Sequence, residues 1–249
     1  MSVASEYPHS LRLGDVTLDL SRRCHVMGIL NITPDSFSDG GNHGDAASAV
    51  DHALRMEEAG AAIIDIGGES TRPGAPEVPL EEELARVIPV IERLRRHSRI
   101  PVSVDTRKAR VADAAIAAGA DMINDVSAMR FDEEMAAVAA RHRLPVVLMH
   151  MQGQPATMQE QPTYEDVVEE VLAFFREHIA DSRRRGVTQI LIDPGIGFGK
   201  TLAHNLALLR QLPRFLALQC PLLIGTSRKS FLGSITGQPV GNRLPGSIA

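Results

Sequence analysis

The sequence has 249 residues, of which 44 % are hydrophobic and 23 % are charged, and its formal net charge is −5. This length fits one α/β barrel or two smaller domains, and the absence of a bulk basic field argues against a nucleic-acid partner. Residues 1–15 lack the pattern of a signal peptide, and no apolar run approaches the roughly 20 residues that span a bilayer. The two cysteines, Cys24 and Cys220, do not suggest a disulfide framework. We therefore expect a soluble cytoplasmic protein with free thiols and no membrane partner.

The first regular segment covers residues 11–20, where apolar and polar residues alternate around Gly14 and Asp15. This alternation predicts a short β-hairpin. We expect the hairpin to cover the bottom of the domain.

The rest of the chain repeats one pattern, in which a short apolar segment ends at a polar residue and is followed by a loop and an amphipathic segment. The pattern predicts helix N-caps at Asp45 and Thr163 and a helix kink at Pro89. It predicts strands at 26–30, 62–66, 102–104, 122–123, 146–149, 190–192 and 222–224, and helices at 45–59, 80–97, 109–118, 132–142, 164–185 and 202–212.

Continuous alternation of strands and helices is typical of a closed TIM-type (β/α)₈ barrel or of a doubly wound sheet. Polar residues end every predicted strand rather than one switch point, which favours the barrel. No change in composition marks a linker, so residues 1–249 are predicted to form a single domain. Only seven units are visible, and we expect the final βα unit to be missing from this sequence.

Three glycines at alternate positions, Gly195, Gly197 and Gly199, follow the sixth predicted strand. They do not form a P-loop, because that motif needs a glycine where Pro194 stands, and the dinucleotide fingerprint would need one at Lys200. Alternate glycines allow a ligand to approach the backbone closely. A tight turn between strand and helix is the alternative interpretation.

Asp105, Asn124 and Asp193 end three of the predicted strands. Each could serve only as a helix N-cap. At the mouth of one barrel, however, two carboxylates and an amide would suit a flat heterocycle with several N–H donors and acceptors, such as an aminopyrimidinone.

The loops also contain cations beside hydroxyl groups, namely Arg72, Arg228 and Lys229. Such groups suit an anion site, although solvated surface charge is the alternative for each of them. Asn31 ends the first strand and offers an oxygen ligand that would suit Mg²⁺ beside a diphosphate. His150 ends the fifth strand and could face the pocket. The histidine spacing does not predict a zinc site.

Taken together, these motifs resemble those of the dihydropteroate synthase family. The resemblance is carried by residues 28–41 (GILNITPDSFSDGG), 65–74 (DIGGESTRPG), 103–106 (SVDT), 123–125 (IND), 148–153 (LMHMQG), 193–200 (DPGIGFGK) and 225–230 (GTSRKS). They run in family order from the first core strand to the end of the chain.

The resemblance implies a TIM barrel that joins 4-aminobenzoate to (7,8-dihydropterin-6-yl)methyl diphosphate, giving dihydropteroate and diphosphate. It implies that Asp105, Asn124, Asp193 and Lys229 hold the pterin, with Asp105, Asp193 and Lys229 as the catalytic residues. It further implies a homodimer, an Asn31 that binds Mg²⁺ and the diphosphate, substrate-lining roles for Thr71, Arg72, Phe198 and Ser227, and a loop carrying Asp35 and Phe37 that closes over the aminobenzoate.

One part of the family pattern, an Arg-x-His motif of the last strand that helps to hold the diphosphate, does not follow residues 225–230 in the 249 residues given. Two alternatives therefore stay open at this point. A non-catalytic pterin-binding paralogue would have lost polar residues at the barrel mouth, and none of Asp105, Asn124 and Asp193 is lost here. A pterin-dependent methyltransferase domain would share the barrel, but the two long Gly-rich loops after the first two strands argue against it.

Overall fold

The computed structural model describes residues 8–32, 42–70, 76–153 and 157–248, with backbone only for 42–45. Within this part of the chain no helix is long and apolar enough to cross a bilayer. Both cysteines are free thiols, Cys24 at the surface and Cys220 buried.

The N-terminal hairpin consists of β1 (Ser10–Leu13) and β2 (Val16–Asp19), which pair antiparallel as the alternation predicted. Its apolar side chains Leu11, Leu13 and Leu18 are buried. They pack in one cluster with side chains from the interior of the main sheet, including Ile63, Met122, Val147 and Leu191. The hairpin therefore closes one end of the domain, as expected.

The main sheet has six parallel strands that pair in the order in which they occur along the chain. A doubly wound sheet would contain a switch point where this order reverses, and none occurs here. The uninterrupted order, with the hairpin cluster on its inner face, is the barrel-type architecture that the sequence predicted. The strands are β3 (Met27–Asn31), β4 (Ile63–Gly67), β5 (Val102–Asp105), β6 (Met122–Asp125), β7 (Val146–Met149) and β8 (Ile190–Asp193).

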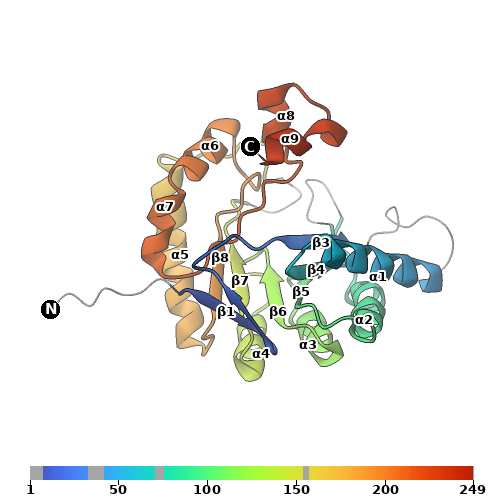
Figure 1. Cartoon of the computed structure of the whole chain (residues 1–249). Coiled ribbons are helices and arrows are strands. Elements are labelled where there is room, and N and C mark those ends of the chain that lie inside the picture. Colours follow the sequence, from blue (N-terminus) through green and yellow to red (C-terminus); the bar gives the residue numbers. More distant parts are fainter. Residues whose placement is uncertain (1–7, 33–41, 71–75, 154–156, 249) are drawn as a thin grey trace.

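Helices cover the outer face of the strands, with the hairpin at one end and the last helices beyond the other end (Figure 1). Apolar side chains between sheet and helices form the larger core, in which Val87, Ile91, Phe175 and Phe215 are fully buried. The helices are α1 (Asn42–Glu58), α2 (Leu80–Arg95), α3 (Ala109–Ala118), α4 (Met135–His142), α5 (Val167–Arg184), α6 (Leu202–Arg210), α7 (Leu212–Phe215), η2 (Leu216–Leu218), α8 (Ser230–Thr236), η3 (Val240–Asn242) and α9 (Leu244–Ile248).

Three predicted helix starts are wrong. Helix α1 begins at Asn42, so Asp45 lies inside it. Helix α5 is capped not by Thr163 but by Asp166, whose carboxylate accepts from two backbone N–H groups of the first turn. Helix α4 begins three residues after Asp132, whose carboxylate accepts from the backbone N–H of Glu134 and also from that of Ala109 at the start of α3.

The predicted seventh strand, residues 222–224, is reduced to a single parallel bridge between Leu222 and Ile192 of β8. Its backbone bonds are Ile192 N–H to Pro221 O at 2.9 Å and Leu223 N–H to Ile192 O at 2.9 Å. The segment therefore lies along β8 where a seventh strand would lie, but the two bonds are too few to form a strand.

Candidate active site

Four neighbouring strands carry a row of paired residues near their carboxyl ends, and three of the four residues are polar. In the register of the sheet, Asn31 pairs with Gly67, Gly67 with Asp105, and Asp105 with Asn124. Since neighbouring strands lie about 4.8 Å apart, Asn31 and Asp105 are roughly 10 Å apart across the gap left by Gly67. The sheet thus brings three of the predicted site residues to one end of the barrel.

Asp65 lies one layer below this row, inside the barrel. It is 2 % exposed, and its Oδ2 accepts a hydrogen bond from Asn124 Nδ2 at 3.0 Å. Its Oδ1 and the hydroxyl of Ser103, which pairs with Asp65 in the register, are buried without a hydrogen-bond partner among the described residues. Burial raises the pKa of Asp65, and the nearby Ser103 hydroxyl and the bond from Asn124 oppose that rise.

Asp105 is partly buried at the end of β5, beside Gly67. Its Cβ lies 3.3 Å from where a Cβ at position 67 would stand, so a side chain at that position would press on the carboxyl group. The pKa of Asp105 lies well above its ordinary value, first because of burial and then because of repulsion from the carboxylates of Asp65, Asp125, Glu83 and Glu69. A positive charge placed beside Asp105 would relieve this repulsion.

Asp193 ends β8 and meets two types of partner. Its Oδ1 accepts a hydrogen bond from the backbone N–H of Gly195 at 2.7 Å. Burial raises the pKa of Asp193, whereas the Gly195 bond and the positive charges of Lys229 and Lys200 lower it. Asp193 therefore stands in a more positive surrounding than Asp105, although both are strand-end carboxylates.

Lys229 and Phe198 form a cation–π pair next to Asp193. The Lys229 Nζ lies 4.1 Å from the centroid of the Phe198 ring. Burial lowers the pKa of Lys229 and the charge of Asp193 raises it. Phe198 also packs on a cluster of buried apolar side chains formed by Val126, Met149, Met151 and Met158. Ser227 is exposed two residues before Lys229.

The three alternate glycines after β8 have φ angles of 68°, 84° and 60° (Gly195, Gly197, Gly199), a region that disfavours other residues. A Cβ at Gly195 would lie 2.0 Å from the carbonyl oxygen of His150, and one at Gly199 would lie 2.6 Å from that of Gln152. The structure thus accounts for these two glycines by close packing of the β8 loop on the β7 loop. It favours the tight-turn alternative over close approach of a ligand.

Lys200 and His150 meet where those two loops touch. Lys200 is 3 % exposed and His150 is 7 % exposed. The Lys200 Nζ lies 2.9 Å from His150 Nδ1 and donates to two backbone carbonyl oxygens. His150 is therefore turned toward Lys200. Burial, followed by the charge of Lys200, lowers its pKa to about 2, which keeps the ring neutral.

A buried charge network supports the loop after β4. Glu69 pairs with Arg107 and Lys108, and Lys108 also donates to Glu83 at 2.6 Å. Burial by itself would lower the pKa of Lys108, but the hydrogen bonds that it donates to Glu69 and Glu83 raise it overall. The network ties the start of the 69–74 segment to β5 and α2.

Comparison with known proteins assigns this site to a family. The profile of the family described as "Pterin binding enzyme" matches residues 27–249. The chain belongs to this pterin-binding family. It is 51 % identical to the dihydropteroate synthase of Synechocystis sp. over 94 % of its own length and 81 % of that protein.

Solved structures agree with this assignment. The dihydropteroate synthase of Xanthomonas albilineans with 4-aminobenzoic acid superposes with a TM-score of 0.89 at 51 % identity, covering 96 % of this chain and 86 % of that one. The complex of the X. albilineans enzyme with 7,8-dihydropteroate gives a TM-score of 0.85 at 48 % identity, with coverage of 96 % and 86 %.

Four of the residues that the pterin-binding motifs assign to the site, Asp35, Phe37, Thr71 and Arg72, lie outside the described residues. Asn31 is exposed at the end of β3. Within the described ranges no group of three or more His, Cys, Asp or Glu side chains could hold a metal ion.

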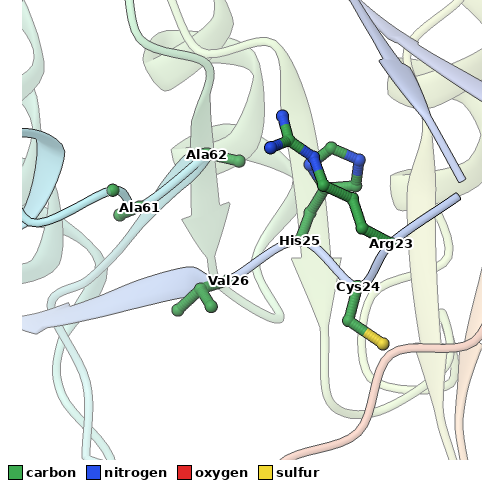
Figure 2. A pocket seen from close by; sticks show the side chains of 7 residues that line it. Arg23, Cys24, His25, Val26, Ala61 and Ala62 are labelled. Carbon is green, nitrogen blue, oxygen red and sulfur yellow. The ribbon is translucent and has the colours of Figure 1, made fainter.

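A cavity of about 260 Å³ lies away from the site, at the amino ends of β3 and β4. It is lined by residues 23–26 and 60–62. Figure 2 shows Arg23 and His25 on one side of the first segment and the Cys24 thiol on the other. The strand ends that carry Asp105, Asn124 and Asp193 are at the opposite end of the barrel, so this cavity is not part of the candidate site.

The sequence reasoning missed Asp65 and the role of Lys200 in the packing of the loops. A signal for Asp65 was present, because an acidic residue stands in the middle of an apolar strand predicted to be buried on both faces. The contact of Lys200 with His150 joins residues 50 positions apart, and no local pattern marks it.

Proposed function

We propose that this chain joins (7,8-dihydropterin-6-yl)methyl diphosphate to 4-aminobenzoate, forming 7,8-dihydropteroate and releasing diphosphate in folate biosynthesis. The relatives and solved structures named above, about half identical over nearly the whole chain, are dihydropteroate synthases. The observation that carries the proposal is the juxtaposition of Asp105 and Asn124 across β5 and β6, with Asn124 fixed by Asp65.

Four residues hold the pterin in this proposal. The carboxylates of Asp105 and Asp193 accept hydrogen bonds from the amino group and the ring N–H groups of the heterocycle. Asn124, on β6 beside Asp105, supplies a side-chain amide. Lys229 donates to an acceptor atom of the ring. The support for this assignment is that Asp105 and Asn124 are register partners and that Lys229 stands in the electrostatic field of Asp193.

The reaction uses the charge of the same residues. The bond between the exocyclic methylene carbon and the diphosphate oxygen breaks, the electron pair leaves with diphosphate, and the pterin carries the positive charge. That charge relieves the repulsion at Asp105, so the site stabilises the cation more than the neutral substrate. The nitrogen of 4-aminobenzoate then forms the new bond and loses a proton, and no strong base is needed.

The remaining lining residues complete the two substrate sites. Phe198 offers an apolar face beside Lys229 and Ser227 an exposed hydroxyl group. Thr71, Arg72 and the loop with Asp35 and Phe37 are assigned to the substrates by motif position alone. In this scheme the loop closes over the aminobenzoate after the diphosphate substrate has bound.

Mg²⁺ is the proposed cofactor, with Asn31 as its protein ligand. The donor set fits, because Mg²⁺ typically takes one or two protein oxygens and completes its shell with water and substrate phosphate oxygens. The described residues around Asn31 contain no metal-binding cluster that would demand a transition metal instead. When bound, Mg²⁺ would supply positive charge that stabilises the leaving diphosphate.

A homodimer in the cytoplasm completes the proposal. The support is family membership and the two free thiols, which fit a reducing compartment. Light scattering of the purified protein tests the dimer, and a mass of one chain at all concentrations would contradict it.

The experiment for the proposed function is a direct product assay. The purified chain is incubated with dihydropterin diphosphate, 4-aminobenzoate and Mg²⁺, and dihydropteroate is measured by mass. Formation of the product, with loss of activity on removal of Mg²⁺ by a chelator, supports the assignment. Pterin binding without product would indicate the non-catalytic paralogue, and transfer of a methyl group from a methylated pterin would indicate the methyltransferase alternative.

A further inference from the structure

Lys200 differs from the other two lysines of the chain. Lys108 pairs with two carboxylates, and Lys229 lies on the Phe198 ring. Lys200 is almost fully buried and has no salt bridge among the described residues. Since burying a cation without a paired anion is unfavourable, its position needs another explanation.

Hydrogen bonding supplies part of the explanation. The Lys200 Nζ lies 2.9 Å from His150 Nδ1, 3.2 Å from His150 O and 2.9 Å from Phe198 O. An ammonium group has three donors, so these three acceptors satisfy it completely. The neutral His150 ring can accept at Nδ1 when its proton sits on Nε2.

The three bonds join two loops that both contribute to the site. His150 belongs to the β7 loop, and its backbone N–H donates to Asp193 O at 2.9 Å. Phe198 belongs to the β8 loop, and its ring lies under the Lys229 ammonium. Lys200 therefore connects His150, whose backbone is bonded to that of Asp193, with Phe198, whose ring contacts Lys229.

We propose that Lys200 is a positioning residue of the pterin site, because it locks the β7 and β8 loops together and thereby holds Phe198 and Lys229 beside Asp193. The inference rests on the proposed function, because it concerns how the pterin is held. It assigns Lys200 no contact with the substrate.

The charge of Lys200 adds a second effect that packing alone would not produce. Together with Lys229 it lowers the pKa of Asp193 against the effect of burial. The pKa of Lys200 itself is lowered to about 7, mainly by burial; the charge of Asp193 opposes this fall, and the charge of Lys229 adds to it. The other titratable groups near this cluster are Tyr164, which donates to Gly199 O, His204 at the start of α6, and Arg130 and His178, whose charges act on His150.

The first test compares Lys200→Met with a matched control, Arg95→Met. Arg95 also donates three hydrogen bonds, to Gly119 O, Ile100 O and Asp121, but at the amino ends of the strands. Both changes remove a partly or fully buried cation with three acceptors. Melting temperature, KM for the pterin diphosphate, kcat and the pH profile of kcat/KM are measured for both variants and for the unmodified chain.

For Lys200→Met we expect KM for the pterin substrate to rise about tenfold or more, on the scale of lost hydrogen bonds to a charged group. We expect the acidic limb of the kcat/KM profile to move to higher pH, because Asp193 loses a nearby positive charge. Arg95→Met should lower the melting temperature and leave KM and the pH profile unchanged. If Lys200→Met changes only the melting temperature, as Arg95→Met does, the proposal is wrong.

Combining Lys200→Met with Lys229→Met separates this mechanism from a general loosening of the loops. If Lys200 acts through Lys229, the effects of Lys200→Met and Lys229→Met on KM will be less than additive in the double variant. Full additivity would overturn the proposal. If the unmodified chain makes no dihydropteroate at all, the proposed function fails instead, so the two failures are distinguishable.

A measurement on the unmodified chain serves if Lys200→Met does not fold. With lysine as the only ¹⁵N-labelled residue type, the three lysines give three side-chain signals. Binding of the anionic pterin diphosphate should raise the pKa of Lys200. A pKa of Lys200 that is the same with and without this ligand would contradict the proposal.

Discussion

Asn124 donates a hydrogen bond from its side-chain Nδ2 to Asp65 Oδ2 over 3.0 Å, inside the barrel and below the row of site residues. An ionised carboxylate only accepts hydrogen bonds, so Asp65 selects the amide orientation in which the Asn124 carbonyl oxygen is available to a ligand. In the proposed site, this carbonyl oxygen accepts from a donor group of the heterocycle. The buried Asp65 thus determines which group of the Asn124 amide faces away from the pair.

Asp65→Asn tests this relationship. An amide at position 65 can accept or donate, so it no longer selects one orientation of Asn124, and we expect pterin affinity to fall by about 1–2 kcal/mol, the scale of one buried hydrogen bond. Calorimetry with a pterin ligand measures the loss. In an Asn124→Ala background the same substitution should cost much less, and an equal cost would show that Asp65 does not act through Asn124.

Asp105→Asn should separate activity from stability. We expect turnover to fall by an amount corresponding to ~2–4 kcal/mol of transition-state stabilisation, because an amide cannot match the charge that stabilises the cation. Unchanged turnover in the folded variant would contradict the role of Asp105.

The same variant has a predicted pH dependence. The folded-state pKa of Asp105 is raised above its ordinary value of 3.8. Its contribution to stability is therefore complete below that value and is lost as the pH rises through the folded-state pKa. Asp105→Asn removes this loss, so its melting temperature should exceed that of the unmodified chain at pH 8, and the difference should shrink toward pH 4.

Lys108→Met should destabilise the fold strongly. It leaves the buried Glu69 and Glu83 without the cation they share, and removing one partner of a buried pair costs about 3–5 kcal/mol. Arg110→Ala is the control, because Arg110 and Glu81 form an exposed pair at 3.7 Å that contributes about 0–1 kcal/mol. Urea unfolding measures both, and similar losses in the two variants would contradict a buried network.

Gly195→Ala should disrupt the contact between the β7 and β8 loops. The added Cβ would lie 2.0 Å from His150 O at a φ of 68°, which adds a clash to a left-handed backbone that by itself costs an L-residue roughly 1–2 kcal/mol. At Gly241, where an added Cβ meets nothing within 4 Å, Gly→Ala is the matched control. We expect a large fall in melting temperature for the first variant only.

The two substrates should bind in order. The proposed function assigns Asp35 and Phe37 to the aminobenzoate site by motif position, so we expect 4-aminobenzoate to bind tightly only when diphosphate and Mg²⁺ are present. Calorimetry with and without these two components gives the answer. Equal affinity under both conditions would contradict the ordered scheme.

The sequence by itself determined the order of the elements, the barrel class and the strand-end residues of the site. Period-2 and helical patterns are local, and in a parallel barrel the carboxyl ends of all strands meet at one end, so Asp105, Asn124 and Asp193 could be grouped before any contact was known. Exact helix starts depend on which side chain binds the first free backbone N–H groups, and in α5 that residue is Asp166 rather than Thr163. Asp132 accepts from the backbone N–H of Ala109 at the start of α3 as well as from that of Glu134, and the first of these bonds exists only because the two segments pack together.

Only the tertiary structure decided which groups support those residues. The bond from Asn124 to Asp65 spans 59 positions, and the contact of Lys200 with His150 spans 50. The energies of such pairs depend on burial and on distances between loops, which follow from packing and not from local sequence. The glycines after β8 show the same limit, because their spacing suggested a ligand but the carbonyl groups of the neighbouring loop occupy the space beside Gly195 and Gly199.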